Sequence, residues 1–300
     1  MGAKLFSIVL LPLLCLVEFS NRRWVSGAAL GVMTVFVAAV SLFQMFWDIR
    51  HPPADQVAVA VESQIPPIPT ETADNSPSSV ADGVVPQSKS DDGLSTFLSR
   101  WEMNDLIFMA MEENIREPEA NEQGDHWFVI LPRSWRIRAS QQLMDWTGLP
   151  PYRIAFVTTR LLTLLLFGGV VLLVSVQACL KKDASAVLEA AFLVLAWFWL
   201  LAPTQNPWYW TWALPFVVFA RNRTWLLVGG VSLVYYLRFW LLYHYSEPGF
   251  WGTGYTGPQF FDFVVVWGEF GPFLVLLFLV WLFRRNEKMP SWLYRTTLDS

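Results

Sequence analysis

Charged side chains are scarce in this 300-residue sequence, at 15% of all residues, against about 25% in soluble globular proteins. A deficit of this size excludes a soluble domain. Acidic residues outnumber basic ones, giving a net charge of −4, and no basic stripe lies outside short loops, which argues against nucleic-acid binding. The only cysteines, Cys15 and Cys179, form no disulfide framework and have no histidine at metal-ligand spacing. We interpret both as packing residues in a membrane.

Apolar residues make up 54% of the sequence and gather into long runs. A membrane-spanning helix needs about 20 of them in succession, and six or seven runs approach that length. The sequence therefore predicts an all-α, polytopic transmembrane helical bundle with a large, partly disordered external loop. The predicted spans are 5–19, 25–47, 161–180, 186–202, 208–220, 225–243 and 260–283. A signal peptide at Met1–Phe19 is the alternative to the first span, although no small-residue cleavage site follows it.

Basic residues between the predicted spans set an orientation, because positive charge prefers the cytoplasmic side of short loops. If the chain crosses at every predicted span, four basic clusters fall on one side. The external face then holds the amino terminus and segments 48–151, 203–207 and 244–259, while 286–300 forms a cytoplasmic tail. The clusters are Arg22-Arg23, Lys181-Lys182, Arg221 with Arg223, and Arg284-Arg285.

These boundaries divide the chain into two N-terminal spans at 1–47, an external loop at 48–151 and a five-span bundle at 152–285. Within the loop, residues 54–93 contain no aromatic residue, five prolines and seven acids against one base. Such a segment buries too little apolar surface to offset its ordering entropy, which predicts a disordered tether. Residues 94–118 read as an amphipathic helix. Residues 119–151 mix tryptophan with arginine and suit the lipid interface.

The stretch "LLAPTQNPWYWTWALPF", Leu200–Phe216, interrupts the apolar pattern with prolines, amides and indoles. One interpretation is a helical hairpin turn with an aromatic belt, since Pro203 can end one helix and Pro207 can start the next. Gln205 and Asn206 would then sit at the external surface. The other interpretation is a substrate site, in which these amides bind hydroxyls while Trp208 and Tyr209 stack on a sugar or prenyl group.

The same stretch resembles the motif "P-T/x-x-P-W-Y-x-x-W-x-L-P" of the polytopic GT-C glycosyltransferases, especially the bacterial hexosyl- and mannosyltransferases of glycosyltransferase family 87. "AKLFSIVLLPLL" with the following Asn21-Arg22-Arg23-Trp24 is similar to the family's Lys-led apolar segment and Arg-rich turn. "FLSRWEMNDLIF" resembles its Trp-x-x-Asn element through Trp101 and Asn104. The resemblance touches most of the chain except 54–93.

This resemblance implies an all-helical enzyme of the bacterial inner membrane. It implies transfer of a sugar from a polyprenyl-phosphate carrier to a glycan or lipid acceptor on the external face. The family's catalytic acid lies in a first external loop, whereas this chain begins with what resembles the middle of the pattern. The catalytic residue is therefore unassigned, and the chain is expected to be a C-terminal part, to work with a partner, or to have lost activity. Asn104 joins Gln205, Asn206, Trp208 and Tyr209 as expected substrate-binding residues.

Arginines inside predicted spans suggest where a carrier phosphate would bind. Arg160 and Arg238 lie toward the external ends of their spans, and a guanidinium matches phosphate oxygens in bidentate fashion. The alternative for Arg238 is an ion pair with Asp262 or Glu269 that locks two helices together.

Three further patterns in the sequence are weaker indications of function. Glu102 and Asp105 share a helix face and are the only candidates for a divalent cation; otherwise no metal or cofactor is expected. "GTGYTG", Gly252–Gly257, fits a dinucleotide motif but lacks the βαβ context that the motif requires. His244 at the external mouth is a possible acid or base.

A transporter or lipid flippase, or a non-catalytic membrane scaffold, remains the alternative function.

Overall fold

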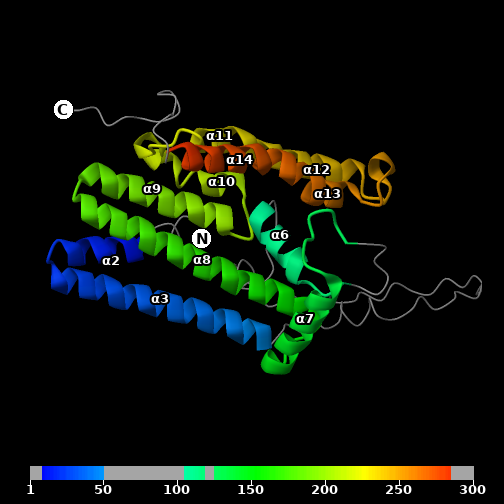
Figure 1. Cartoon of the computed structure of the whole chain (residues 1–300), viewed down its shortest axis with the longest axis horizontal. Coiled ribbons are helices and arrows are strands. Elements are labelled where there is room, and N and C mark those ends of the chain that lie inside the picture. The colour runs from blue at the N-terminus through cyan, green and yellow to red at the C-terminus, as the bar shows by residue number, and fades with distance from the viewer. Residues whose placement is uncertain (1–8, 51–104, 119–124, 285–300) are drawn as a thin grey trace, which may run out of the picture. The chain divides into compact units, whose positions relative to one another are not determined.

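The computed structural model describes residues 9–50, 105–118 and 125–284. The described chain is helical and contains no strand (Figure 1). The α-helices are α2 (Leu11–Ser20), α3 (Trp24–Arg50), α6 (Leu106–Ile115), α7 (Arg133–Thr147), α8 (Pro151–Lys181), α9 (Ala184–Leu201), α10 (Pro207–Trp210), α11 (Trp225–Val231), α12 (Tyr235–His244), α13 (Gly257–Phe260) and α14 (Val266–Arg284). Short 3-10 helices are η2 (Leu214–Phe219), η3 (Ser232–Val234) and η4 (Phe250–Gly252), and η5 (Phe261–Val265) is a π-helix.

The second half of α3, from residue 38 onward, belongs to a separate compact unit, of which it is the only described element. The other unit holds the rest of the described helices. The predicted tether at 54–93, the start of the predicted amphipathic helix at 94–104 and the predicted tail at 286–300 lie outside the described residues. From the predicted amphipathic helix, α6 is described, and it buries Leu106 and Phe108.

Four helical stretches are long and apolar enough to cross a membrane: Arg153–Lys181, Ala184–Leu201, Trp225–His244 and Gly257–Phe283. They coincide with four of the predicted spans, so the all-helical fold is confirmed, with four helices of membrane-spanning length and composition. Two shorter apolar helices, Leu11–Ser20 and Trp24–Val40, stand at the two N-terminal predicted spans.

The predicted span at 208–220 was wrong as a continuous helix. α10 ends after four residues, and a turn then leads into the 3-10 helix η2. Pro215 explains the break, because inside an α-helix its ring would clash with the carbonyl of Thr211 and no amide would be left to bond it.

The segment after α10 nevertheless runs back along α9. Trp210 contacts Trp199 near the C-terminal end of α9, with ring centroids 5.3 Å apart. At the other end, Arg221 Nε lies 3.0 Å from Glu189 Oε2, in the second turn of the same helix. Arg221 therefore lies toward the end of α9 that follows Lys181 and Lys182.

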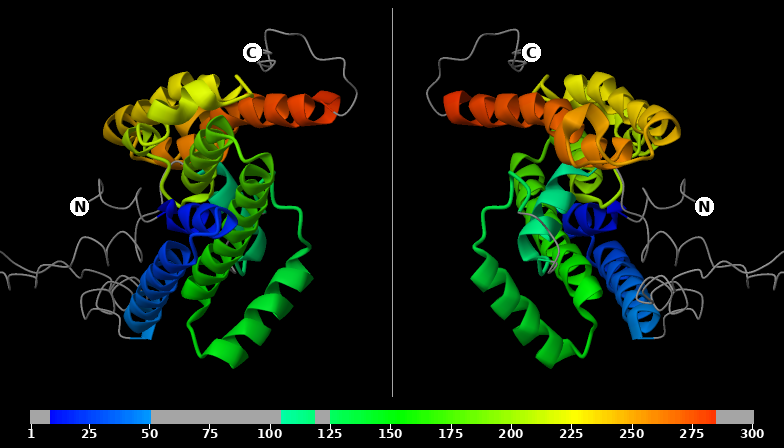
Figure 2. Two further views of the ribbon diagram at one scale, coloured as in Figure 1. Left: turned by 90° about the vertical axis from the view of Figure 1, so that its left-hand side faces the viewer. Right: turned by 90° about the vertical axis from the view of Figure 1, so that its right-hand side faces the viewer.

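The helix α9 lies at the centre of the larger unit. Its apolar window is 56% buried, against 22–28% for the other three candidate spans. Helices α2, α8 and α9 pack side by side, α11 and α12 pack along η5 and α14, and α6 contacts α8, α9 and α14 (Figures 1 and 2). Large rings fill the interior between these elements. They include Phe192, Trp199, Trp225, Phe270 and Phe273.

The predicted orientation leads to a direct labelling test. In a variant in which Cys15 and Cys179 are replaced by alanine, we expect Thr253→Cys to react with a membrane-impermeant thiol reagent in intact cells. Asn222→Cys should react only after the membrane is permeabilised, because it lies beside the basic residues Arg221 and Arg223. The reverse pattern would invert the orientation.

Candidate functional site

Polar side chains gather on both sides of the π-helix η5. Asp262 of this segment faces Arg238 on α12, and the next residue, Phe263, lies against His126 from the loop before α7. Single π-helical turns inside longer helices are frequent at functional sites. The segment therefore joins two clusters, which we name the arginine cluster (Asp105, Tyr235, Arg238, Asp262) and the histidine cluster (Glu113, Arg116, His126, Tyr255).

The arginine cluster is built on a bidentate ion pair. Arg238 donates from Nε to Asp262 Oδ1 and from Nη2 to Asp262 Oδ2, both at 2.9 Å. The side chains are 18% and 27% exposed, so the pair is mostly shielded from solvent. Asp105, at the start of α6 and itself buried, adds a second negative charge that acts on Arg238. The predicted ion-pair alternative is thus present, and a guanidinium has five N–H donors, of which this pair uses two.

The predicted aromatic site reaches this cluster through one residue. Trp208 on α10 contacts the buried ring of Tyr235, with centroids 5.8 Å apart. Tyr235 lies one turn before Arg238 on α12. Trp208 and Arg238 therefore both neighbour Tyr235, one through a ring contact and the other through its charge. Tyr209 packs beside Trp208 and Trp212.

The two predicted amide ligands are buried instead of lying at a surface. Gln205 is 0% and Asn206 is 1% exposed. Gln205 Nε2 donates to the Leu200 carbonyl at 2.7 Å, and the Asn206 carbonyl accepts from Trp199 Nε1 at 3.0 Å. These bonds fold the segment back onto the C-terminal end of α9. The Gln205 side chain and the Asn206 backbone carbonyl thus shape the turn that positions Trp208.

Arg160, the second predicted phosphate ligand, lies against an aromatic ring on its own helix. Its guanidinium carbon is 4.3 Å from the ring centroid of Phe156, one turn earlier on α8, and that ring in turn meets Phe108 of α6. Asn104 and Glu102 lie outside the described residues. Among the described ranges, no group of three His, Cys, Asp or Glu residues could hold a metal ion.

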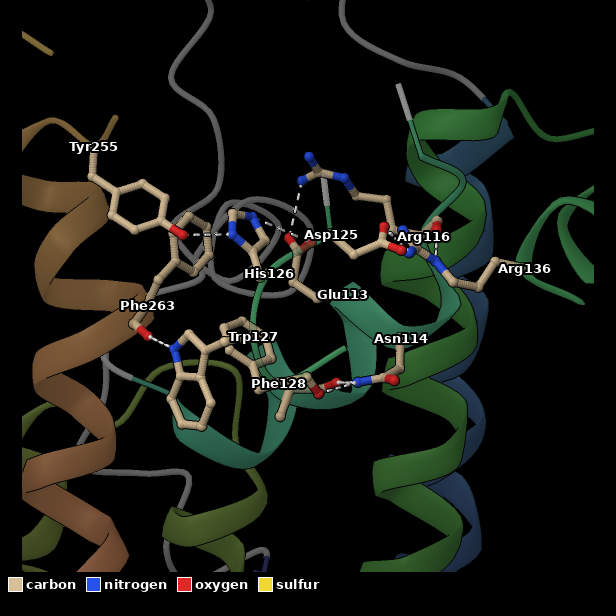
Figure 3. Close-up of polar contacts among 11 residues, drawn as sticks. Glu113, Asn114, Arg116, Asp125, His126, Trp127, Phe128, Arg136, Tyr255 and Phe263 are labelled. Carbon is tan, nitrogen blue, oxygen red and sulfur yellow. Dashed lines mark hydrogen bonds and ion pairs between the residues drawn. The ribbon is translucent and has the colours of Figure 1, made fainter. Parts of the chain in front are cut away.

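The histidine cluster forms a chain of polar contacts across three segments (Figure 3). His126 Nδ1 lies 3.0 Å from the Tyr255 hydroxyl, and His126 Nε2 lies 4.0 Å from Glu113 Oε2. The other carboxylate oxygen, Glu113 Oε1, accepts from Arg116 Nη1 at 3.0 Å. The chain thus runs from a carboxylate through an imidazole to a phenol.

Side-chain bonds hold the loop that carries His126. Asn114 Nδ2 donates to the Phe128 carbonyl, and Asn114 Oδ1 accepts from the amides of Ile130 and Leu131. Trp127 Nε1 donates to the Phe263 carbonyl at 3.1 Å. The imidazole of His126 stacks on the Phe263 ring, with centroids 4.1 Å apart.

A buried arginine fixes the neighbouring residue Asp125. Arg136 on α7 is 3% exposed; it pairs with the Asp125 carboxylate and donates from Nε to the Arg116 carbonyl at 2.8 Å. Arg136 thereby ties the end of α6 to the start of the loop. The position of His126 is therefore set by Arg136 on one side of the loop, by Asn114 on the other, and by the Phe263 ring on which it stacks.

The chemistry of this series of contacts depends on the protonation of the Tyr255 phenol. The pKa of Tyr255 is raised above its ordinary value, first because burial disfavours the phenolate and second because the charge of Glu113 repels it. Tyr255 therefore keeps its proton at neutral pH. A Glu113 carboxylate near Nε2 favours the tautomer with its proton on Nε2, which leaves Nδ1 to accept from the phenol.

This raised pKa predicts a pH dependence. The folded protein holds the Tyr255 proton at pH values where the unfolded chain, with a tyrosine pKa of about 10, has lost it. The resulting stabilisation is present below pH of about 10 and is lost as the pH rises through the raised pKa. Phenolate absorbance, taken as wild type minus Tyr255→Phe, should show this pKa, and Glu113→Gln should lower it. An unmoved Tyr255 titration in Glu113→Gln would contradict the contact.

The histidine cluster was missed at the sequence level because its members have no common spacing. Glu113 and His126 lie on opposite sides of a short loop, and Tyr255 follows more than a hundred residues later. The only local signal was His126 beside Trp127 and Phe128. His244, which the sequence did suggest, stacks on Trp240 and contacts that residue's carbonyl at 2.8 Å.

The glycine motif at 252–257 has a structural explanation. Gly252 has a positive φ of 72°, and Gly257 approaches the end of α12 closely enough that a Cβ there would lie 2.7 Å from the Leu241 carbonyl oxygen. No strand precedes it in the described chain, so the dinucleotide interpretation is not supported. No family model, curated protein or solved structure matches this chain.

Proposed function

We propose that the protein is a membrane glycosyltransferase that moves a hexose, mannose being the first candidate, from a polyprenyl-phosphate carrier to a glycan or lipid hydroxyl. We place the reaction at the external face of a bacterial inner membrane. One observation carries the proposal: Trp208 of the "PTQNPWYW" stretch contacts Tyr235, one turn from Arg238. An aromatic surface for a sugar or prenyl group thus lies beside a cation suited to phosphate.

The arginine cluster supplies the electrostatics that such a donor needs. Arg238 is oriented by Asp262, and its three remaining N–H donors are enough for a phosphate that joins or replaces the carboxylate. Leaving-group charge that grows on the phosphate during transfer would be stabilised by this preoriented cation. Trp208 is 45% exposed, which leaves part of its indole free to stack.

The proposed topology keeps six or seven crossings. It takes the four helices long and apolar enough to span a membrane, the two N-terminal apolar helices and the segment 207–220 that returns along α9. On this topology the histidine cluster and the arginine cluster both face outward, whereas Arg221 and Glu189 face the cytoplasm.

One feature favours a lipid flippase or transporter as the second candidate. The return segment at 207–220 is a discontinuous helix beside buried polar groups, and transporters bind cargo at such breaks. The two candidates differ in chemistry, because a flippase moves the carrier lipid intact while a transferase releases the carrier phosphate.

The test uses the full chain in lipid nanodiscs with radiolabelled polyprenyl-phosphate mannose or polyprenyl-phosphate glucose. Release of polyprenyl phosphate, together with transfer of label to added glycan or lipid extract, is expected for one of the two donors. Trp208→Ala should weaken donor use about tenfold or more, while Trp281→Ala, an exposed indole on α14, should not. In proteoliposomes, movement of the intact donor without release of polyprenyl phosphate would identify a flippase and overturn the transferase.

A further inference from the structure

We propose that Tyr255, His126 and Glu113 form a proton relay that removes the proton of the acceptor hydroxyl, with Tyr255 as the group that meets the acceptor. The sugar donor in this step rests on the proposed function. The relay supplies the catalytic base that the sequence does not identify.

The contacts define the direction in which a proton would move. The Tyr255 hydroxyl lies 3.0 Å from His126 Nδ1, and Glu113 Oε2 faces His126 Nε2 across 4.0 Å. In the tautomer with its proton on Nε2, the hydroxyl donates to Nδ1. A hydroxyl can donate one hydrogen bond and accept another at the same oxygen. The Tyr255 oxygen is therefore able to accept from an acceptor hydroxyl while its own proton points toward the imidazole. The order carboxylate, imidazole, hydroxyl is the general logic of an activated hydroxyl.

The imidazole is held more firmly than a purely surface residue would be. Stacking on Phe263 sets the plane of the ring, and the Phe128 ring lies next to it, with 5.6 Å between centroids. Asn114 fixes the backbone of residues 128–131. A base that is prevented from rotating loses less entropy when it takes up a proton in the transition state.

Among the described residues, Glu113 is a carboxylate that faces the imidazole. Arg116 pairs with Glu113 Oε1, while Oε2 lies toward His126. Asp125, the residue before His126, is paired with Arg136. The pKa of Tyr255 is raised by burial and by Glu113, which keeps the phenol in the protonated form that the relay requires.

The proposed step balances in atoms and charge. The acceptor oxygen forms a bond to the anomeric carbon, and the bond from that carbon to the carrier phosphate oxygen breaks, with its electron pair leaving on polyprenyl phosphate. The acceptor proton passes to the Tyr255 oxygen as the Tyr255 proton passes to His126 Nδ1. The imidazolium that results is stabilised by Glu113, and it loses its proton to solvent before the next cycle.

The relay places the two clusters in complementary roles. Asp262 and Phe263 are consecutive residues of η5, so Arg238 with its phosphate and His126 with its phenol flank one short segment. A donor held at Arg238 would present its anomeric carbon beside η5, the segment against which His126 stacks. This proximity is a second reason to assign Tyr255 to the acceptor.

The experiment compares variants of the full chain in nanodiscs, with the labelled donor that the wild type uses. Tyr255→Phe and His126→Gln should lower kcat about 100-fold or more while the Kd for the donor stays within about threefold. Tyr243→Phe, at an exposed tyrosine, is the matched control and should retain activity. Glu113 is a positioning residue: Glu113→Gln should shift the acidic limb of the kcat/KM profile to lower pH, because the imidazolium loses its countercharge.

Two failures are distinguishable. If the wild type transfers sugar and Tyr255→Phe and His126→Gln do so at similar rates, the relay is overturned and the transferase stands. If the wild type releases no polyprenyl phosphate from either donor, the transferase and the relay's role in it are both overturned. An unchanged pH profile in Glu113→Gln would remove Glu113 from the relay.

Discussion

Arg238→Gln is expected to destabilise the protein by about 2–4 kcal/mol, a value between that of an exposed ion pair and that of a fully buried one. The change removes both N–H···O bonds to Asp262 and leaves its partly buried carboxylate without this cation. Equilibrium unfolding in mixed micelles, followed by tryptophan fluorescence, measures the difference.

The double variant Arg238→Gln/Asp262→Asn separates structure from ligand binding. It should recover at least half of the lost stability, because no carboxylate remains unpaired. Both variants lack the guanidinium, so we expect each to bind polyprenyl phosphate about tenfold or more weakly than the wild type does. Arg238→Lys keeps the charge but not the two-pronged geometry and should fall between. Unchanged polyprenyl-phosphate binding in the well-folded double variant would remove Arg238 from the proposed site.

Gly257→Ala is the second change with a large expected effect, a loss of about 1–3 kcal/mol with the upper end favoured. The new Cβ would lie 2.7 Å from the Leu241 carbonyl oxygen and 2.8 Å from that of Tyr245. Both are backbone atoms at the end of α12, so relief requires that α13 move away from α12. That movement would lengthen the bond of 2.6 Å from the Gly257 amide to the Tyr245 carbonyl.

Gly254→Ala is the matched control for this glycine. It lies three residues away in the same motif, with no atom near its added Cβ and no positive φ. We expect its stability to stay within about 0.5 kcal/mol of wild type. Thermal unfolding of both variants in detergent decides the matter: similar melting temperatures for Gly257→Ala and wild type would show that α12 and α13 are not in close contact.

The length of hydrophobic runs predicted four of the long apolar helices well, because a helix that crosses the bilayer must be continuously apolar over its length. The same measure failed at 208–220, where residues are apolar enough but Pro215 prevents continuous α-helical bonding. For Arg238 the sequence offered both a phosphate and an ion pair, and it could not choose between them, since the choice depends on how α12 packs against η5.

Other features were beyond a reading of local pattern. Gln205 and Asn206 looked like exposed ligands because loops are usually exposed, yet their bonds to α9 bury them. The contact between His126 and Tyr255 joins segments far apart in the sequence, and no spacing rule relates them. Long-range contacts of this kind follow from packing, which a single sequence does not display.

The π-helix η5 behaves as a one-residue insertion within an otherwise α-helical span. An α-helix turns by 100° per residue, so deleting one residue such as Val264 would rotate everything before it by about that angle relative to α14. Phe270 and Phe273 would keep their buried face, whereas Asp262 and Phe263 would turn away from Arg238 and His126. Length and hydropathy of the span would hardly change. Deletion of one codon would therefore separate the two clusters, and its reinsertion would bring them together again. The membrane topology would stay the same in both cases.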